Sequence, residues 1–199
     1  MKKKREEKVR EYISKAAVLF AEKGYSKCGV DELASVMGLS KGGFYWHFKS
    51  KEDLYCSICS SICTDHQKQV AGLIDREDVN YESILKATTD ILSFSLKDKV
   101  YIRLFSDFHS ESKGIGRVQK VLMEIDRIWY AILLKLFRRL KERKHIASRL
   151  SPEVVARQCI VFYNGLLIYY NIYEDTQKVI KEWKEFMSQF FTDAKGGDR

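Results

Sequence analysis

The residues of this chain with the clearest chemical potential lie within one short stretch. Lys41 and Lys51 carry positive charges ten positions apart, and Gly42 and Gly43 follow the first of them directly. Trp46, between the two lysines, has a side chain that can stack on a sugar or contact a thymine methyl group. Lysines at such positions neutralise phosphates, and each phosphate contact adds to the salt dependence of binding. This combination predicts a surface that meets a nucleic acid.

Two short helices must position these side chains. The first is expected at about 31–37, where Leu33, Ala34 and Met37 form an apolar stripe on one side. Ala34 is small, as a close crossing of two helices requires. Gly38 then supplies a residue that adopts positive φ without strain, which suits a sharp reversal of the chain.

The second helix is expected at about 41–48. Ser40 is a good N-cap for it, and the glycines that follow keep its first turn slim. Together the two helices predict a helix-turn-helix motif over residues 29–48. In such a motif the second helix lies in the major groove of DNA and the first crosses the backbone.

These residues resemble the DNA-binding domain of tetracycline-repressor (TetR) family regulators. The matching positions are Ala16-Ala17, Leu19 to Tyr25, Ala34, Gly38-Leu39-Ser40-Lys41-Gly42, Phe44-Tyr45, His47-Phe48 and Ser50-Lys51-Glu52-Asp53-Leu54. The resemblance covers roughly the first 60 residues. It implies a three-helix DNA-binding domain over residues 1–53 and an effector-binding and dimerisation domain over residues 54–199. It also implies a regulator, most simply a repressor, and not an enzyme.

The resemblance implies further contacts with DNA. Tyr45 and His47 match positions whose hydroxyl and ring nitrogen contact phosphates. Cys28 and Gly29 stand where the family pattern has Thr-Thr or Thr-Ser, and Gly43 replaces a small side chain, so specificity rests more on the remaining groups. The predicted DNA-binding residues are Cys28, Gly29, Lys41, Gly42, Gly43, Tyr45, Trp46, His47 and Lys51.

The whole chain is predicted to be all-α, with about nine helices and no sheet, because it has one proline and no β-type alternation. The other expected helices are at about 6–23, from the Ser50-x-x-Asp53 capping sequence to about 76, and at about 81–96, 100–110, 118–143, 152–173 and 176–192. Lys2 to Arg5 are expected to form a basic arm before the first helix.

Composition agrees with a DNA-binding protein. The 199 residues carry a net charge of +8, and residues 1–55 contain 12 Lys and Arg against 8 Asp and Glu. This balance favours a polyanionic partner. With five cysteines, no targeting signal and no apolar run long enough to span a bilayer, we expect a cytoplasmic protein without disulfides, membrane contact or cofactor.

The second part of the chain is expected to bind a small, mostly apolar effector, because aromatic side chains recur there at helical spacing. The candidate ligand-binding residues are Phe105, His109, Asp126, Trp129, Phe162 and Asn164. The helices at about 152–173 and 176–192 carry apolar stripes wider than one chain needs. The resemblance implies that this pair forms the interface of a homodimer, which suits a palindromic operator.

Three cysteines share one face of the fourth expected helix. Cys56, Cys59 and Cys63 are spaced at i, i+3 and i+7, with His66 further along. They are either small buried hydrophobes, a thiol sensor or a metal site. A thiol-sensing repressor is therefore the alternative to a ligand-responsive one. An enzyme that borrowed the motif and an architectural DNA binder are less favoured, because no catalytic set or nucleotide loop is present and the aromatic second part is large.

Overall fold

The structure is a computed structural model that describes residues 2–74, 80–146 and 149–191. Within these ranges the side chains of residues 2–4, 63, 65, 66, 69, 73 and 74 are not described. In the described part the chain forms nine α-helices and no strand; an isolated bridge pairs Ile146 with Phe191. The predicted all-α fold is confirmed. No helix in this part is long and apolar enough to cross a membrane.

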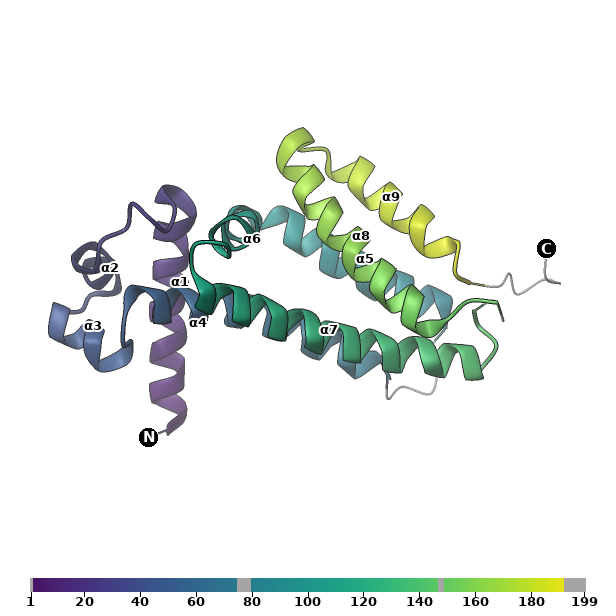
Figure 1. Ribbon diagram of the computed structural model, residues 1–199, viewed down its shortest axis with the longest axis horizontal. Helices are drawn as coiled ribbons and strands as arrows, with labels where there is room; N and C mark the ends of the chain where they lie inside the picture. Colours follow the sequence, from purple (N-terminus) through teal and green to yellow (C-terminus); the bar gives the residue numbers. More distant parts are fainter. Residues whose placement is uncertain (1, 75–79, 147–148, 192–199) are drawn as a thin grey trace. The chain divides into compact units, whose positions relative to one another are not determined.

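The helices follow one another with short connections (Figure 1). Their bounds are α1 Lys2–Lys23, α2 Val30–Met37, α3 Lys41–His47, α4 Lys51–Ile74, α5 Tyr81–Lys97, α6 Lys99–Glu111, α7 Gly116–Glu142, α8 Pro152–Tyr173 and α9 Thr176–Ser188.

The chain divides into two compact units. The first comprises Met1–Cys63 and Lys99–Glu124, and the second comprises Thr64–Asp98 and Ile125–Arg199. Helices α4 and α7 contribute residues to both. The boundary expected between residues 53 and 54 falls within α4 and remains a prediction.

The first unit has a core to which five helices contribute. Phe20 of α1, Leu33 of α2, Phe44 of α3, Leu54 of α4 and Leu104 of α6 are all fully buried. Helix α6, which follows the helix-turn-helix by some 50 residues, packs directly on α1. Burial of these large apolar groups is the main force that holds α2 and α3 in place.

The expected basic arm at the N-terminus is wrong. Helix α1 begins at Lys2, so Arg5 lies in its first turns rather than in an extended tail. No glycine or proline interrupts the chain between Lys2 and Lys23, and lysine, arginine and glutamate are good helix formers. The helix ends at Gly24, which has a φ of +80°.

The second unit contains α5, α8 and α9. A reciprocal capping box between Asn80 and Ser83 starts α5. Trp183 of α9 is buried and its Nε1–H donates to Thr88 Oγ1 of α5 at 3.1 Å, so this aromatic group is satisfied within its own unit. At the start of α8, Ser151 occupies the N-cap position but makes no side-chain capping bond, because its hydroxyl donates to Glu153 instead.

Candidate nucleic-acid interface

The turn between α2 and α3 is built as the sequence predicts. Gly38 adopts left-handed geometry with a φ of +71°, and the Leu39 N–H donates to the carbonyl of Ala34. Ser40 caps α3, since its Oγ accepts the Gly43 N–H at 3.1 Å. At the other end, Gly29 begins α2 without a side-chain cap, and Asp31 and Glu32 place negative charge in its first turn.

Helix α3 has one buried and one exposed side. Phe44 is fully buried and Phe48 nearly so, whereas Tyr45 is 50% exposed and Trp46 is 64% exposed. The exposed side of α3 is thus available to an external partner.

Two consecutive glycines, Gly42 and Gly43, follow Lys41 in the first turn of α3, although the fold does not require glycine there. A Cβ at Gly42 would come no closer than 3.9 Å to Ser40 Oγ, and a Cβ at Gly43 would make ordinary contacts of 3.4 to 3.5 Å with Ser40 and Leu39. Neither glycine has a positive φ. Because these two residues have no side chains, their backbone can approach another surface closely.

His47 is held against α1. Its ring meets that of Tyr12 edge-on, with 4.9 Å between the centroids. Partial burial, helped by the positive charge of Arg5, lowers the pKa of His47 below its ordinary value of 6.5. This shift favours the neutral imidazole, which can still donate one hydrogen bond.

The two lysines of the motif differ in their surroundings. Lys41 is exposed and pairs with Asp31 of α2 at 3.0 Å, a pair that a phosphate can replace. Lys51 is partly buried, and its Nζ donates to the carbonyls of Tyr25 at 2.9 Å and Cys28 at 3.0 Å. It also lies 4.2 Å from the centre of the Tyr25 ring. Lys51 thus ties the connection between α1 and α2 to the start of α4.

Cys28 turns away from the surface. Its side chain is 2% exposed and its Sγ lies 3.7 Å from the carbonyl oxygen of Leu19. A direct side-chain contact with DNA is not available in this position. Gly29 is exposed, and a Cβ there would meet nothing within 4 Å.

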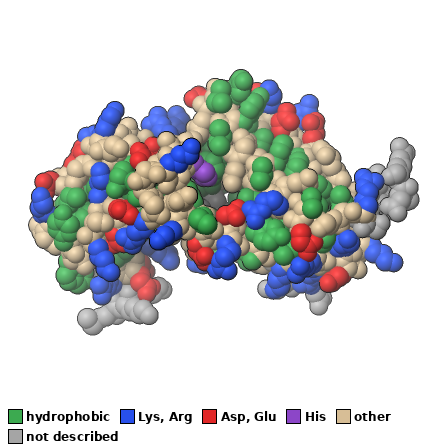
Figure 2. Space-filling view, viewed as in Figure 1, with side chains coloured by type: hydrophobic (Ala, Val, Ile, Leu, Met, Phe, Trp, Pro, Cys, Tyr) green, Lys and Arg blue, Asp and Glu red, His purple; other side chains and the backbone are tan. Residues whose placement is uncertain are grey.

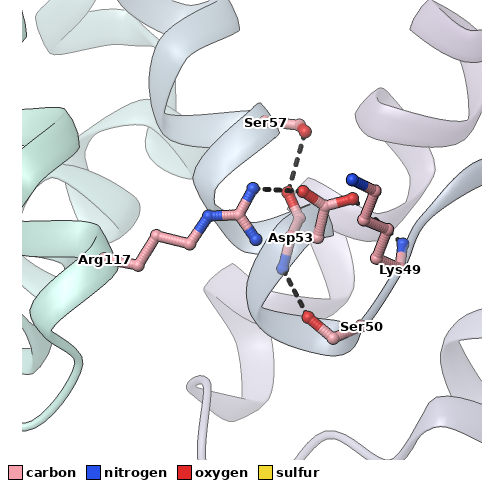
Figure 3. Close-up of polar contacts among 5 residues, drawn as sticks. All are labelled: Lys49, Ser50, Asp53, Ser57 and Arg117. Carbon is pink, nitrogen blue, oxygen red and sulfur yellow. Dashed lines mark hydrogen bonds and ion pairs between the residues drawn. The ribbon is translucent and has the colours of Figure 1, made fainter.

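Two arginines outside the predicted DNA-binding set make contacts at this site. The Arg5 guanidinium of α1 lies over the Trp46 ring of α3, with 4.7 Å from Cζ to the ring centroid. Arg117 of α7 pairs with Asp53 in the first turn of α4, as Figure 3 shows. Both contacts join residues far apart in the sequence, so no local pattern predicts them.

An aromatic cluster connects this site to α6 within the first unit. The fully buried ring of Tyr55 contacts Phe20 of α1 at 5.0 Å, Tyr25 at 4.7 Å and Phe108 of α6 at 4.7 Å. Its hydroxyl donates to Asp107 Oδ2 at 3.1 Å. Helix α6 therefore meets the DNA-binding helices through a packed core and not only through the chain connection of α4.

The residues predicted to bind an effector fall in both units. Phe105 and His109 belong to the first, where their rings lie 4.4 Å apart and the exposed His109 bonds through Nδ1 to the Phe105 carbonyl. Asp126, Trp129, Phe162 and Asn164 belong to the second.

Within the second unit the charged member of this set is already paired. Asp126 binds Arg157 of α8 at 2.7 and 2.9 Å, in a partly exposed ion pair. Phe162 stacks on Phe186 of α9 at 4.1 Å, while Trp129 and Asn164 are half-buried. A pocket that unites all six remains a prediction.

The cysteines of α4 that the structure describes are packed in the core. Cys56 is 4% exposed and Cys59 is 1% exposed, and burial raises the pKa of the Cys56 thiol, as it does that of Cys28. Reactive thiols have a lowered pKa and partial exposure, so these three resemble packing groups. Cys63 and His66 lie outside the described side chains. No cluster of metal-ligating side chains occurs in the part of the chain that the structure describes.

Comparison with known proteins agrees with this geometry. Residues 13–58 match the family model of bacterial regulatory proteins of the tetR family. Among curated proteins, the HTH-type transcriptional regulator YerO of Bacillus subtilis is 29% identical over 171 residues, which are 82% of this chain and 57% of YerO. The HTH-type transcriptional repressor DhaR of Mycobacterium sp. is 23% identical, over 90% of this chain and 86% of DhaR.

Solved structures share the fold across nearly the whole chain. SmeT, the repressor of the Stenotrophomonas maltophilia multidrug efflux pump SmeDEF, has a TM-score of 0.81 at 14% identity and matches 94% of this chain and 91% of its own. The helix-turn-helix site with its all-α scaffold is that of a DNA-binding transcriptional regulator. Residues 13–58 thus carry the DNA-binding domain of the TetR family of regulators, and the fold of the chain is similar to that of solved TetR-family structures.

Proposed function

We propose that this protein binds an operator in double-stranded DNA by inserting α3 into the major groove, and that it represses transcription there. The observation that carries the proposal is the exposed side of α3, where a bare first turn adjoins the exposed rings of Tyr45 and Trp46. Two similar proteins act negatively on transcription: DhaR is a repressor, and IcaR of Staphylococcus epidermidis is a negative regulator of the icaADBC operon. This similarity supports repression rather than activation.

Each residue of the predicted set receives a role in this proposal. The Tyr45 hydroxyl and the neutral His47 ring donate to phosphates, and Lys41 exchanges Asp31 for a phosphate. Gly42 and Gly43 let the backbone approach the base edges, and Trp46 contacts a base. Gly29 presents its backbone at the start of α2.

The packing of the chain suggests the domain division and the roles of Cys28 and Lys51, the two residues of the set not yet assigned. Residues 1–53 would carry DNA binding, with α6 as their support, and residues 54–199 would carry the other activities. Cys28 and Lys51 would act by shaping the connection before α2, since the thiol is buried and the ammonium is held by two carbonyls. A further phosphate contact by Lys51 stays a prediction.

We also propose a homodimer formed through α8. Of the stripe predicted on α8 for this interface, Val155, Cys159 and Leu166 are buried within the chain, Phe162 and Tyr169 are partly exposed, and Tyr173 is 59% exposed. A different face of α8 is exposed and apolar, over the region where Figure 2 shows hydrophobic side chains gathered on the surface.

That exposed face, which we call the α8 seam, follows a regular pattern. Exposed apolar residues recur every seven positions along it: Val154, Val161 and Ile168, which are 52%, 63% and 47% exposed. The exposed Gly165 and Ile172 follow Val161 and Ile168 at four positions. Alternating steps of three and four are the spacing of a helix that packs against a partner helix. A two-fold axis at the seam would give a self-complementary interface and two copies of α3 for a palindromic site. By contrast α9 presents mainly charged side chains to solvent, so α8 is the better candidate.

A small, mostly apolar effector is the proposed signal. SmeT has been solved in complex with triclosan, and that structure matches this chain with a TM-score of 0.82 at 12% identity. Release from DNA requires that the effector bind the released state better, and a hundredfold loss of operator affinity corresponds to about 2.7 kcal/mol of coupling. Triclosan is therefore a rational first probe for thermal shift and operator release.

The central experiment is selection of a binding sequence from random duplex DNA, followed by affinity measurement over a range of salt concentrations. Tyr45→Ala should weaken operator binding roughly tenfold, because a hydrogen bond to a charged phosphate is lost. The matched control is Phe94→Ala, which removes another exposed aromatic group, on α5. Failure of the wild-type protein to select any sequence, or equal losses in the two variants, would refute the proposal.

A further inference from the structure

Arg5 and Trp46 form a cation–π pair between the first turns of α1 and the exposed side of α3. The guanidinium Cζ lies 4.7 Å from the indole centroid, yet the indole remains 64% exposed. The arginine therefore covers part of the ring and leaves the rest accessible. Planar guanidinium groups stack in this way while their edge N–H groups remain free to donate.

The pair belongs to a longer row of contacts. Trp46 meets His47 at 4.5 Å with the rings at 89°, His47 meets Tyr12 at 4.9 Å, and Lys8 Nζ lies 5.8 Å from the centre of the Tyr12 ring. The row runs from α1 to α3 and back to α1, and a cation lies at each end. The indole contacts both Arg5 and His47, and these contacts restrict its rotation even though it is exposed.

We infer that Arg5 is a positioning residue for DNA recognition, which fixes the Trp46 indole so that it contacts a thymine methyl group in the major groove. This inference rests on the proposed DNA-binding function and deepens it. Helix α3 offers few other groups that read bases, because Gly42 and Gly43 have no side chains. The methyl group of thymine is the apolar feature of the major groove, and an indole is the apolar side chain suited to meet it.

Holding the indole in advance improves binding because its rotational freedom is then not lost on association. The effect belongs to the specific complex only. A non-specific complex is held mainly by phosphates and gains little from an ordered indole. Arg5 should consequently affect the ratio of specific to non-specific affinity more than it affects overall affinity.

The test uses the full-length protein, the selected operator and an unrelated duplex of the same length. Arg5→Ala should lower operator affinity about two- to fivefold, the range expected for loss of an exposed cation–π contact, with little change on the unrelated duplex. Arg5→Lys should restore part of the loss. Arg10→Ala removes the same charge from an exposed position of α1 and serves as the control.

A double-mutant cycle shows whether Arg5 acts through Trp46. Once Trp46→Ala is present, Arg5→Ala should cost nothing further, because the two changes remove one interaction. Replacing each thymine of the operator in turn by deoxyuridine removes only the methyl group. The wild-type protein should lose affinity at one thymine in each half-site, Arg5→Ala should reduce that loss, and Trp46→Ala should abolish it.

Other results would contradict the inference. Equal losses on operator and unrelated duplex, or additive effects of the two substitutions, would make Arg5 a simple phosphate contact. If no deoxyuridine substitution lowered the affinity of the wild-type protein, Trp46 would not contact a thymine methyl group. Both residues are exposed, so unchanged helical circular dichroism and melting temperature are expected for all variants. A wild-type protein that does not distinguish the two duplexes would instead overturn the proposed function.

Discussion

Arg117 and Asp53 form an ion pair between the first turns of α7 and α4, with 2.5 Å between Nη2 and Oδ1 (Figure 3). Asp53 also accepts the Lys49 N–H at 3.0 Å, and its own N–H donates to Ser50 Oγ at 3.0 Å. These bonds fix the start of α4 against α7. Three residues separate this point from the end of α3. Because α7 continues without a break to Glu142, the pair connects the site to a helix shared with the second unit.

Removing Arg117 should reduce stability in a pH-dependent way. Partial burial by itself would raise the pKa of Asp53, but the bonds from Lys49 and Arg117 outweigh it and hold that pKa below its ordinary value of 3.8. A lowered folded-state pKa contributes stability that is present above the unfolded value and is lost as the pH falls through the folded value. Arg117→Ala should therefore lower the free energy of unfolding by up to about 1 kcal/mol at neutral pH.

Melting temperatures measured from neutral pH down to about pH 2.5, well below the ordinary pKa of 3.8, check this expectation, and the wild-type and Arg117→Ala curves should converge on the acid side. Lys181→Ala breaks a more exposed pair with Glu185 on α9 and should have a smaller effect. A constant difference between the two proteins at all pH values would show that Arg117 acts through packing and not through the Asp53 carboxylate.

Helix positions could be predicted from the sequence because the residues that end helices act locally. Gly24 and Gly38 adopt positive φ, and Ser40 and Asn80 cap the helices that follow them. Such signals depend on neighbours within about four positions, so they can be recognised without a fold.

The contacts that shape the site could not be predicted in the same way. Arg117 lies 64 positions from Asp53, and Lys51 reaches carbonyls 23 and 26 positions away. A helical period shows which residues share a face but not what that face meets. For this reason the apolar stripe of α8 was expected at a dimer interface, whereas Val155 and Cys159 are buried within the chain.

Lys51→Met should destabilise the protein. Methionine keeps much of the aliphatic stem but cannot donate to the carbonyls of Tyr25 and Cys28, so the free energy of unfolding should fall by about 1–3 kcal/mol. Urea denaturation followed by circular dichroism measures this loss. Lys41→Met, which breaks only an exposed pair with Asp31, should change stability by less than about 1 kcal/mol.

The same two variants separate structural from DNA-binding roles. Lys41→Met should reduce the salt dependence of operator binding by about one phosphate contact. Lys51→Met should leave that slope unchanged if its ammonium stays with the carbonyls. A slope reduced by about one in Lys51→Met would establish the phosphate contact that the sequence predicted for it.

The glycines of the motif should separate folding from DNA binding. Gly42→Ala should retain or slightly raise stability, by roughly 0.5–1 kcal/mol, because alanine favours a helix and its Cβ has room. Operator affinity should nevertheless fall, since the added methyl group obstructs close approach. Gly38→Ala should instead destabilise the fold, because Gly38 has a φ of +71° that alanine adopts only with strain. Unchanged operator affinity in Gly42→Ala would show that the bare first turn of α3 does not approach DNA.

The α8 seam should control the oligomeric state. Ile168→Glu places a charge where two seams would meet, and a charge left unpaired in a dry interface is costly. We expect the wild-type protein to sediment as a dimer and Ile168→Glu as a folded monomer, because Ile168 is 47% exposed and its replacement leaves the core intact.

Val18→Glu is the matched control for this experiment. Val18 is 42% exposed on α1, so the substitution adds the same charge at a similarly exposed apolar position away from the seam. Val18→Glu should remain dimeric. Ile168→Glu should also lose affinity for a two-half-site operator while keeping that for a single half-site, because only the link between the two copies of α3 is broken. An Ile168→Glu protein that sediments as a dimer and binds the full operator normally would place the interface elsewhere on the chain.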